Sequence, residues 1–285
     1  MRNNHEVTAQ LAQAEKCAAK YGKQLYHYTS LSSLYGIICN KELWLGNTAM
    51  MNDKCEMTNF IDSMQTTALT DFPEKRDEIL SISTELKKDI DHKHPYIICL
   101  SELEDNAAQW ERYADNATGV CIAFNTEMLS YLFMQYNGFI QKVFYGCNIR
   151  NHEHYEILRK YLLSSKTPGF SNRESWLNNI LATASSHKHP SFTSECEYRA
   201  IIFPELISLS QDSLHIDYKL VGSHIKKVLV VKYDNCDRIH MANLFDHIII
   251  GPRSPQNIHV LKNFLCDKGF PELAEKVFYS DCPLR

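Results

Sequence analysis

The stretch EYRAIIFPELISLSQDSLHIDYKLVGSHIKKVLVVK (197–232) decides the fold class. It contains three runs rich in β-branched and aromatic residues, EYRAIIF (197–203), SLHID (213–217) and KVLVVK (227–232), and such runs predict strands. These strands do not alternate strictly with helices. That order favours an α+β fold over a doubly wound parallel sheet.

The rest of the chain adds strands and helices around this stretch. Further β-type runs predict strands at 24–29, 42–46, 95–101, 119–124, 139–146, 247–251 and 276–280. Periodicity and composition predict helices at 6–21, 53–66, 73–90, 107–115, 151–165 and 173–186. The expected fold class is α+β, a mixed β-sheet core with flanking helices.

Two further helices have recognisable end signals. Ser30 is expected to cap a helix whose apolar residues follow the helical repeat. These apolar residues are Leu31, Leu34, Tyr35 and Ile38. A late helix is expected to have Ser254 as its N-cap, Pro255 at its first position and Gly269 just past its end.

Composition and charge limit the classes of function. The 285 residues are 44% apolar and 22% charged, as in a globular protein and unlike a disordered chain. The net charge of −4 gives no broad basic field for non-specific nucleic-acid binding. No apolar run approaches the ~20 residues that cross a bilayer, and the N-terminal residues show no signal-peptide stretch. We therefore expect no membrane partner.

Residues 1–285 are expected to form a single domain, because no long linker, repeat or low-complexity tract interrupts them. This domain would have an N-terminal helix at about 1–22 and helical insertions at 73–90 and 151–186. The ten cysteines include no CxxC pair, which argues against a zinc ribbon. Many stand in apolar strings, which is typical of buried thiols in a reducing compartment, so we expect a cytoplasmic protein.

The first candidate site residue is His27, in the run LYHYTS (25–30). On a strand, Tyr26 and Tyr28 point to one face and His27 to the other, beside Thr29. Just before a capped helix, the imidazole is well placed to bond a ligand. The alternative is a satisfied core or edge histidine.

The second candidate lies in CLSELEDNAAQWERYAD (99–115). Ser101 ends a strand, and Trp110 and Tyr113 are three residues apart on the following helix, so they share a helix face. Two rings placed in this way can form an aromatic wall for a flat ligand ring. The alternative is that both rings only pack the helix on the sheet.

Two carboxylates and a guanidinium form the third candidate, in TSECEYRAIIF (193–203). In strand geometry Glu195, Glu197 and Arg199 fall on one face. Such charges are costly at the head of an apolar strand unless they bond something. The alternative is that Arg199 neutralises a glutamate on the sheet surface, where the pair contributes little.

Two weaker features remain. Asn52, Asp53 and Glu56 are spaced to cap the start of a helix, and Asn52 is a ligand candidate only if this turn faces the same cleft. The histidine pairs at 92–94, 152–154 and 187–189 have no obvious third ligand and are expected to be solvated polar clusters, since a catalytic zinc normally takes three protein ligands. We therefore expect no bound metal.

Taken in order, these segments resemble a widespread bacterial family of unknown function. The resemblance runs from about residue 25 to the C-terminus. Its residues are LYHYTSLSSLYGIICNKELWL from 25, NDxxE from 52, LS…WxxYA…GVCIAF from 100, ExEYR from 195, IIIGP from 248 and the terminal YSDCPLR. The family usually has a proline after Asn-Asp, where this chain has Lys54.

The start of this string also resembles the first motif of ADP-ribosyltransferase-like proteins. The matching residues are His27, Thr29, Ile37, Ile38 and Leu43. The resemblance implies an ADP-ribosyltransferase-like fold with NAD as the substrate. By the same resemblance His27 would bind a ribose of NAD, Tyr113 would orient the nicotinamide, and Glu197 would hold the nicotinamide ribose. Ser101 or Trp110 could take the place of Tyr113.

The chemistry of such a reaction suits these residue types. Breaking the bond to nicotinamide leaves an oxocarbenium-like ribose, which a neighbouring carboxylate such as Glu197 stabilises. Glu195 would activate or bind the acceptor. Arg199 would hold Glu197 ionised or meet the diphosphate. Thr29 and Asn52 complete the expected NAD-binding set.

The resulting hypothesis is an enzyme that splits NAD and transfers ADP-ribose to a protein or nucleic acid, or hydrolyses NAD. By analogy such an enzyme in a bacterial cytoplasm is a toxin or a phage-defence effector. One alternative is a non-catalytic module that senses a nucleotide or nucleic acid. Another is a nuclease, which would need Asp53, Glu56, Glu195 and Glu197 to converge on a metal. The sequence leaves the acceptor and the oligomeric state open.

Overall fold

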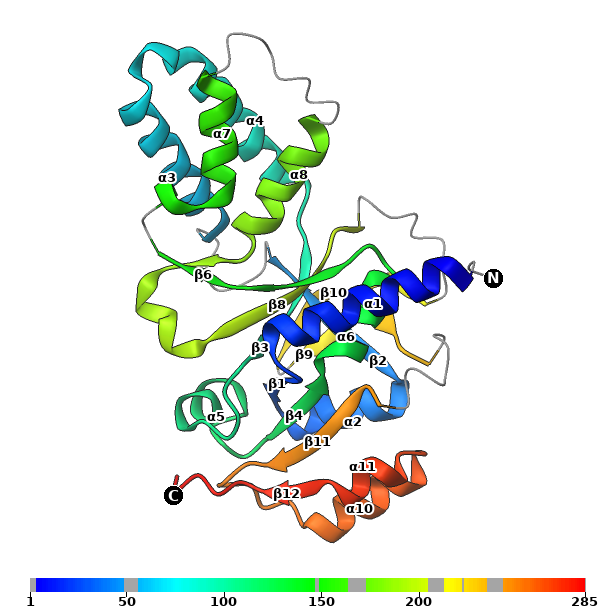
Figure 1. The fold of residues 1–285 in the computed structure, drawn as a ribbon. Coiled ribbons are helices and arrows are strands. Elements are labelled where there is room, and N and C mark those ends of the chain that lie inside the picture. The colour runs from blue at the N-terminus through cyan, green and yellow to red at the C-terminus, as the bar shows by residue number, and fades with distance from the viewer. Residues whose placement is uncertain are drawn as a thin grey trace. The chain divides into compact units, whose positions relative to one another are not determined.

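A computed structural model of the chain describes residues 4–48, 56–146, 149–163, 173–204, 213–221, 223–234 and 243–284. The chain forms two compact units (Figure 1). The first, here called the core unit, comprises Met1–Gly46, Tyr96–Lys142 and Glu195–Arg285. The second, here called the helical unit, comprises Asn47–Pro95 and Val143–Ser194.

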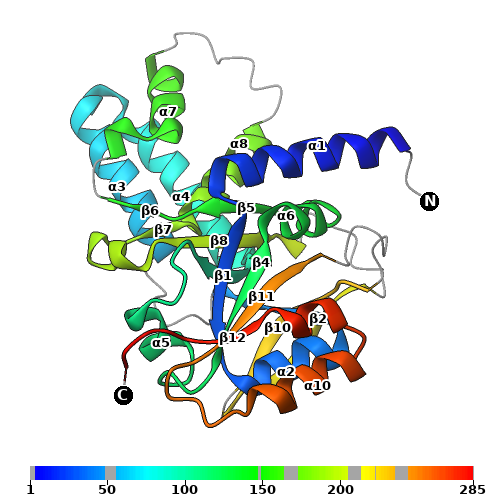
Figure 2. The ribbon, with the colours of Figure 1, turned by 60° about the horizontal axis from the view of Figure 1, so that its bottom comes forward.

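The core unit is built on one mixed sheet, which confirms the predicted α+β class. Its strands are β1 (Gln24–Thr29), β2 (Glu42–Asn47), β3 (Tyr96–Ser101), β4 (Val120–Asn125), β5 (Phe139–Lys142), β8 (Glu197–Ile202), β9 (Leu214–Val221), β10 (His224–Lys232), β11 (Phe245–Ile250) and β12 (Val277–Tyr279). The order is β12-β11-β4-β1-β3-β2-β10-β9, and β8 pairs with both β3 and β5. Strands β11 and β12 are parallel, whereas β1–β4 and β3–β8 are antiparallel. Figure 2 shows β4 between β1 and β11.

The helices of the core unit cover both faces of this sheet. They are α1 (Asn4–Tyr21), α2 (Leu31–Asn40), α5 (Ala107–Tyr113), α6 (Thr126–Met134), α10 (Ile258–Asp267) and α11 (Pro271–Glu275). Alternation along β1 divides the core, because successive side chains point to opposite faces. Leu25 joins the larger apolar cluster, and Tyr26 and Tyr28 join a smaller one with Trp110.

The helical unit contains α3 (Glu56–Asp71), α4 (Arg76–His92), α7 (Glu153–Leu163) and α8 (Arg173–Ala184), which Figure 1 shows grouped together. A short parallel pair, β6 (Phe144–Tyr145) and β7 (His187–Lys188), lies in the same unit. The helices expected at 73–90 and 151–186 therefore belong to this unit. The expectation of a single domain stays a prediction, because a division into compact units describes packing and not independent folding.

Three local predictions need correction. The strand expected at 139–146 is two strands, β5 and β6, which belong to different sheets. The late helix begins at Ile258, and its N-cap is Asn257, whose side chain accepts from the backbone N–H groups of His259 and Val260. Ser254 instead donates its backbone N–H to Gly251. Tyr35, which the helical repeat assigned to the buried face, is exposed on α2.

Other end signals are confirmed. Ser30 caps α2 by accepting from the backbone N–H of Ser33. Gly269 follows α10 with a φ of 89°, a conformation that glycine adopts without strain.

Candidate functional site

Three strands meet side by side at the candidate site. In the antiparallel register Tyr26 of β1 lies opposite Ser101 of β3, and Ser101 lies opposite Glu197 of β8. Directly opposed residues of antiparallel strands share a face of the sheet. Tyr26, Ser101 and Glu197 therefore stand in one row on one face.

Helix α5 packs on that same face. Its Trp110 ring meets the Tyr28 ring edge-on, with centroids 4.9 Å apart and planes at 85°. The helix is fixed at its start by Asn106, whose Oδ1 accepts from the backbone N–H groups of Ala108 and Gln109. This cap and the buried indole set where the later side chains of α5 point.

Glu195 is the centre of the site. Its backbone carbonyl accepts from Ser101 Oγ at 2.8 Å and from Gln109 Nε2 at 3.0 Å. Its carboxylate accepts from the Tyr113 hydroxyl at 2.7 Å and from Arg112 Nη1 at 3.3 Å. The Glu195 side chain is 4% exposed, whereas Tyr113 is 45% exposed and Arg112 is exposed as well. Two solvent-facing groups thus converge on a buried carboxylate.

A buried ion pair lies two residues further along the chain. Arg199 Nε is 2.8 Å from Glu197 Oε1, and both side chains are almost fully buried. Burying either charge alone would be costly. Each side chain therefore neutralises the charge of its partner within the apolar strand. Its planar guanidinium also fixes the orientation of the Glu197 carboxylate.

Strained backbone gathers around these groups. Of the seven non-glycine residues with positive φ in the described parts of the chain, five flank α5 or separate the two glutamates. They are Asp105, Asp115, Asn116, Ala117 and Cys196. Left-handed conformations of non-glycine residues cost free energy and persist where the surroundings fix them, often at functional sites. The Ala117 turn is fixed by its N–H bond to the Trp110 carbonyl at 2.9 Å.

Cys196 corrects the predicted strand geometry. Its φ of 46° turns the chain, so that Glu195 ends a 3-10 helix (Pro190–Glu195) and β8 begins only at Glu197. The expectation that Glu195 shares a strand face with Glu197 and Arg199 is therefore wrong. The two glutamates still contact the same end of β3, because Glu195 bonds Ser101 through its backbone.

His27 lies on the opposite face of β1 from Tyr26 and Tyr28. Its Nδ1 is 2.8 Å from the carbonyl oxygen of Cys99, and its ring packs near Phe124. Burial lowers the pKa of this imidazole. Thr29 is buried on the same side of the strand as His27. In the described part of the chain, hydrogen bonds therefore bring Ser101 and Tyr113 together at Glu195. The His27 ring takes part in none of these hydrogen bonds.

One other predicted residue, Trp110, is placed differently from the expectation. Trp110 is fully buried and donates its indole N–H to Asp105 Oδ1 at 2.6 Å. It therefore cannot form an open aromatic wall with Tyr113, and the prediction of a two-ring wall is wrong. Asn52 and Asp53 lie outside the described residues.

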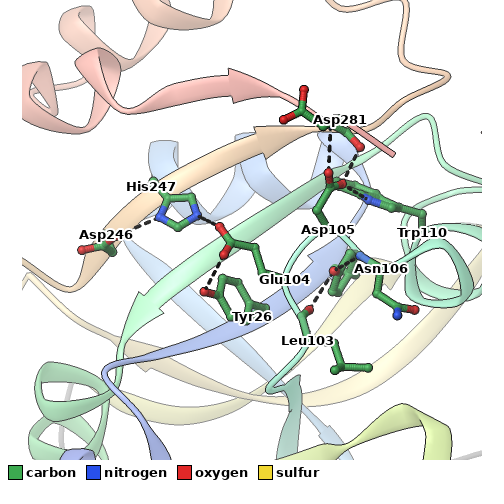
Figure 3. A network of polar contacts seen from close by, with 11 residues as sticks. Tyr26, Leu103, Glu104, Asp105, Asn106, Trp110, Asp246, His247 and Asp281 are labelled. Atoms are coloured by element: carbon green, nitrogen blue, oxygen red, sulfur yellow. Dashed lines mark hydrogen bonds and ion pairs between the residues drawn. The ribbon is translucent and has the colours of Figure 1, made fainter. Parts of the chain in front are cut away.

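A polar network next to α5 was missed by the sequence reasoning (Figure 3). His247 Nδ1 is 2.8 Å from Asp246 and its Nε2 is 3.0 Å from Glu104, which also accepts from the Tyr26 hydroxyl at 3.2 Å. Asp105 accepts from the backbone N–H of Asp281 at 2.9 Å. The run ELED (102–105) could have indicated this network, because acidic residues just before a helix often serve as hydrogen-bond acceptors.

The histidine pairs are less solvated than expected. His154 and His187 are buried in the helical unit, and His154 Nε2 is 2.5 Å from Thr183 Oγ1. The rings of His152 and His187 both lie against Phe60 and Phe144. Among the described residues, no group of three or more histidine, cysteine, aspartate or glutamate side chains could hold a metal ion.

The fold and the site together define an α+β protein whose polar cluster is built around two glutamates. Residues 109–200 match the model of a family described as "Protein of unknown function (DUF2971)". The match confirms the expected relationship to a family of unknown function, and it runs from Gln109 on α5 to Ala200 on β8, through both glutamates.

Searches of curated proteins and of solved structures gave no match. In the described ranges, none of the helices has the length and apolar character needed to cross a bilayer.

Proposed function

We propose that the chain is an NAD-consuming enzyme of the ADP-ribosyltransferase type, with its site on the sheet face that carries Ser101, Glu195 and Glu197. The observation that carries the proposal is the convergence of Ser101, Gln109, Arg112 and Tyr113 on Glu195. Buried carboxylates held by positioned donors are what stabilisation of a developing cation requires. The strained backbone around α5 supports the same location.

The reaction assigned to the site breaks the bond between nicotinamide and C1′ of the ribose. The bonding electrons leave with nicotinamide, and the cationic C1′ then takes an oxygen or nitrogen nucleophile from water or an acceptor, which loses its proton. Glu197 would stand beside C1′, oriented by Arg199. Glu195 would receive the acceptor, and the half-exposed Tyr113 and Arg112 would turn outward to meet nicotinamide and the diphosphate.

The test is nicotinamide release from NAD by the purified full chain, measured by chromatography. Wild type should release nicotinamide, and Glu197→Gln should slow release by about 100-fold or more, as expected when a transition-state charge partner is lost. Glu102→Gln is the matched control, because Glu102 lies one residue after Ser101 and pairs with Lys142 instead. Equal rates for Glu197→Gln and wild type would contradict the proposal.

A non-catalytic nucleotide-binding module is the second candidate. One observation favours it: Glu195 and Glu197 are already bonded to partners within the chain. Calorimetry with ADP-ribose separates the two candidates. Binding of ADP-ribose that depends on Arg112, together with no nicotinamide release by wild type with proteins or nucleic acids present, would select the module.

A further inference from the structure

Three highly exposed apolar side chains lie on one hairpin. Ile225, Leu220 and Tyr218 are 76%, 68% and 66% exposed, the highest values among the large hydrophobic residues that the structure describes. All three belong to strands β9 and β10 of the core unit. Single exposed apolar residues need no explanation, but three together mark an interaction surface.

The register places these side chains next to one another. Ile225 lies directly opposite Leu220, and Tyr218 lies opposite Lys227. Opposed residues share a face, and so do residues two apart on one strand. Tyr218, Leu220, Ile225 and Lys227 therefore form one continuous face of the hairpin, here called the hairpin face.

The hairpin is basic, although the chain as a whole is acidic. Residues 214–232 contain four lysines and one aspartate, a charge of +3, whereas the whole chain carries −4. Lys226 lies opposite Lys219, which pairs with Asp217 at 2.8 Å. In the part of the chain that the structure describes, Lys226 and Lys227 form no ion pair. Lys227 therefore supplies a basic group on the hairpin face, and Lys226 supplies one on the opposite face close to the same end of the hairpin.

On the hairpin face, the aliphatic pair and the Tyr218–Lys227 pair lie at different distances from the hairpin end. Leu220 and Ile225 lie nearer the place where β9 gives way to β10, and Tyr218 and Lys227 lie two residues further back. At about 3.3 Å per residue, the two levels are separated by about 7 Å. Aliphatic groups ahead of tyrosine and lysine are the arrangement found at a bilayer surface, where apolar groups enter the acyl boundary and basic groups meet the headgroups.

We propose that the end of the β9–β10 hairpin docks on an anionic lipid surface. Leu220 and Ile225 enter the headgroup boundary, while Lys226 and Lys227 contact the anionic headgroups. Such peripheral docking needs no membrane-spanning segment, so the lack of a long apolar run in the sequence does not oppose it. The proposal is independent of the NAD site.

The other partners fit the hairpin face less well. The phosphates and bases of a nucleic acid would contact the lysines and Tyr218, but they would leave the exposed aliphatic pair in water. A second copy of the chain would cover the aliphatic pair, but it would bring the Lys227 side chains of two copies together, because Lys227 shares a face with that pair. An anionic lipid surface satisfies both the apolar and the charged groups.

Sedimentation with vesicles tests the proposal. Wild type should bind vesicles of phosphatidylcholine and phosphatidylglycerol at 7:3 and should bind phosphatidylcholine alone much more weakly. Lys226→Gln with Lys227→Gln should weaken binding to the mixed vesicles by about 30-fold, since each lysine near an anionic surface contributes about fivefold. Leu220→Asn with Ile225→Asn should abolish binding.

Matched variants on α10 and at its C-cap residue serve as controls. Val260→Asn with Lys268→Gln changes an exposed apolar residue and an exposed lysine elsewhere and should leave vesicle binding unchanged, and circular dichroism confirms that each variant is folded. Failure of folded wild type to bind the mixed vesicles would overturn the proposal. So would binding that survives both hairpin pairs, lysine-dependent binding of single-stranded DNA without vesicle binding, or a dimer that Leu220→Asn with Ile225→Asn dissociates.

Discussion

The Tyr113 hydroxyl donates to the Glu195 carboxylate at 2.7 Å across 82 residues of sequence. Tyr113 is half-exposed at the end of α5, and Glu195 is buried where the chain enters β8. A partly exposed donor thus holds a buried acceptor at the site. This relationship is the basis of the first prediction.

Tyr113→Phe removes the hydroxyl and keeps the ring. We expect the free energy of unfolding to fall by about 1–2 kcal/mol, because a hydrogen bond to a charged acceptor is lost. Under the proposed function, nicotinamide release should also slow. Urea unfolding measures the first effect, and an unchanged unfolding midpoint would show that this hydrogen bond does not hold Glu195 in solution.

Arg199→Met leaves the Glu197 carboxylate buried without its counter-charge. We expect a loss of about 3–5 kcal/mol in the free energy of unfolding. The double variant Glu197→Leu with Arg199→Met should lose much less than the sum of its single variants, because it removes both buried charges. Additive losses in this double-mutant cycle would contradict the coupling.

Asp105→Ala removes an acceptor that three donors share. Trp110 Nε1, Ser280 Oγ and the backbone N–H of Asp281 all donate to Asp105. Because the indole N–H is buried, we expect a loss of at least about 2 kcal/mol in thermal or urea unfolding. Asp281→Ala is the control. Asp281 contributes only its backbone N–H to this contact, so its substitution should lower the free energy of unfolding very little. Similar losses in both variants would refute this role of the Asp105 carboxylate.

His154 predicts how stability depends on pH. Burial lowers the pKa of His154 to about 4 from the ordinary 6.5. Between these values the unfolded chain binds a proton that the folded chain does not, so the free energy of unfolding should fall as the pH drops from 6.5 toward 4. His154→Gln should flatten this slope, whereas the exposed His259→Gln should not. Parallel pH profiles for wild type and His154→Gln would contradict the assignment.

Local patterns predicted the elements of the fold well where the cause is local. The strand at 24–29 and the Ser30 cap depend on neighbours in sequence, and both are confirmed. The start of α10 was misplaced because two capping residues, Ser254 and Asn257, stand three residues apart. Helix α6 was overlooked, although Asn125 caps it. The split of 139–146 between two sheets depends on partners distant in sequence, which periodicity does not contain.

The candidate site was predicted in part for the same reason. Ser101, Tyr113 and Glu195 were singled out individually, and the structure brings them into contact. The left-handed turn at Cys196 could not be read from the residue type, because cysteine has no preference for that conformation. The face on which His27 lies follows from strand alternation, but which face would carry α5 depends on tertiary packing.

The most direct test of the account is a crystal structure of Glu197→Gln with NAD bound. The account predicts nicotinamide against Tyr113 and the nicotinamide ribose beside residue 197, with Arg112 turned toward the diphosphate. NAD bound elsewhere, for example on the His27 face of β1, or no NAD bound at saturating concentration, would contradict it.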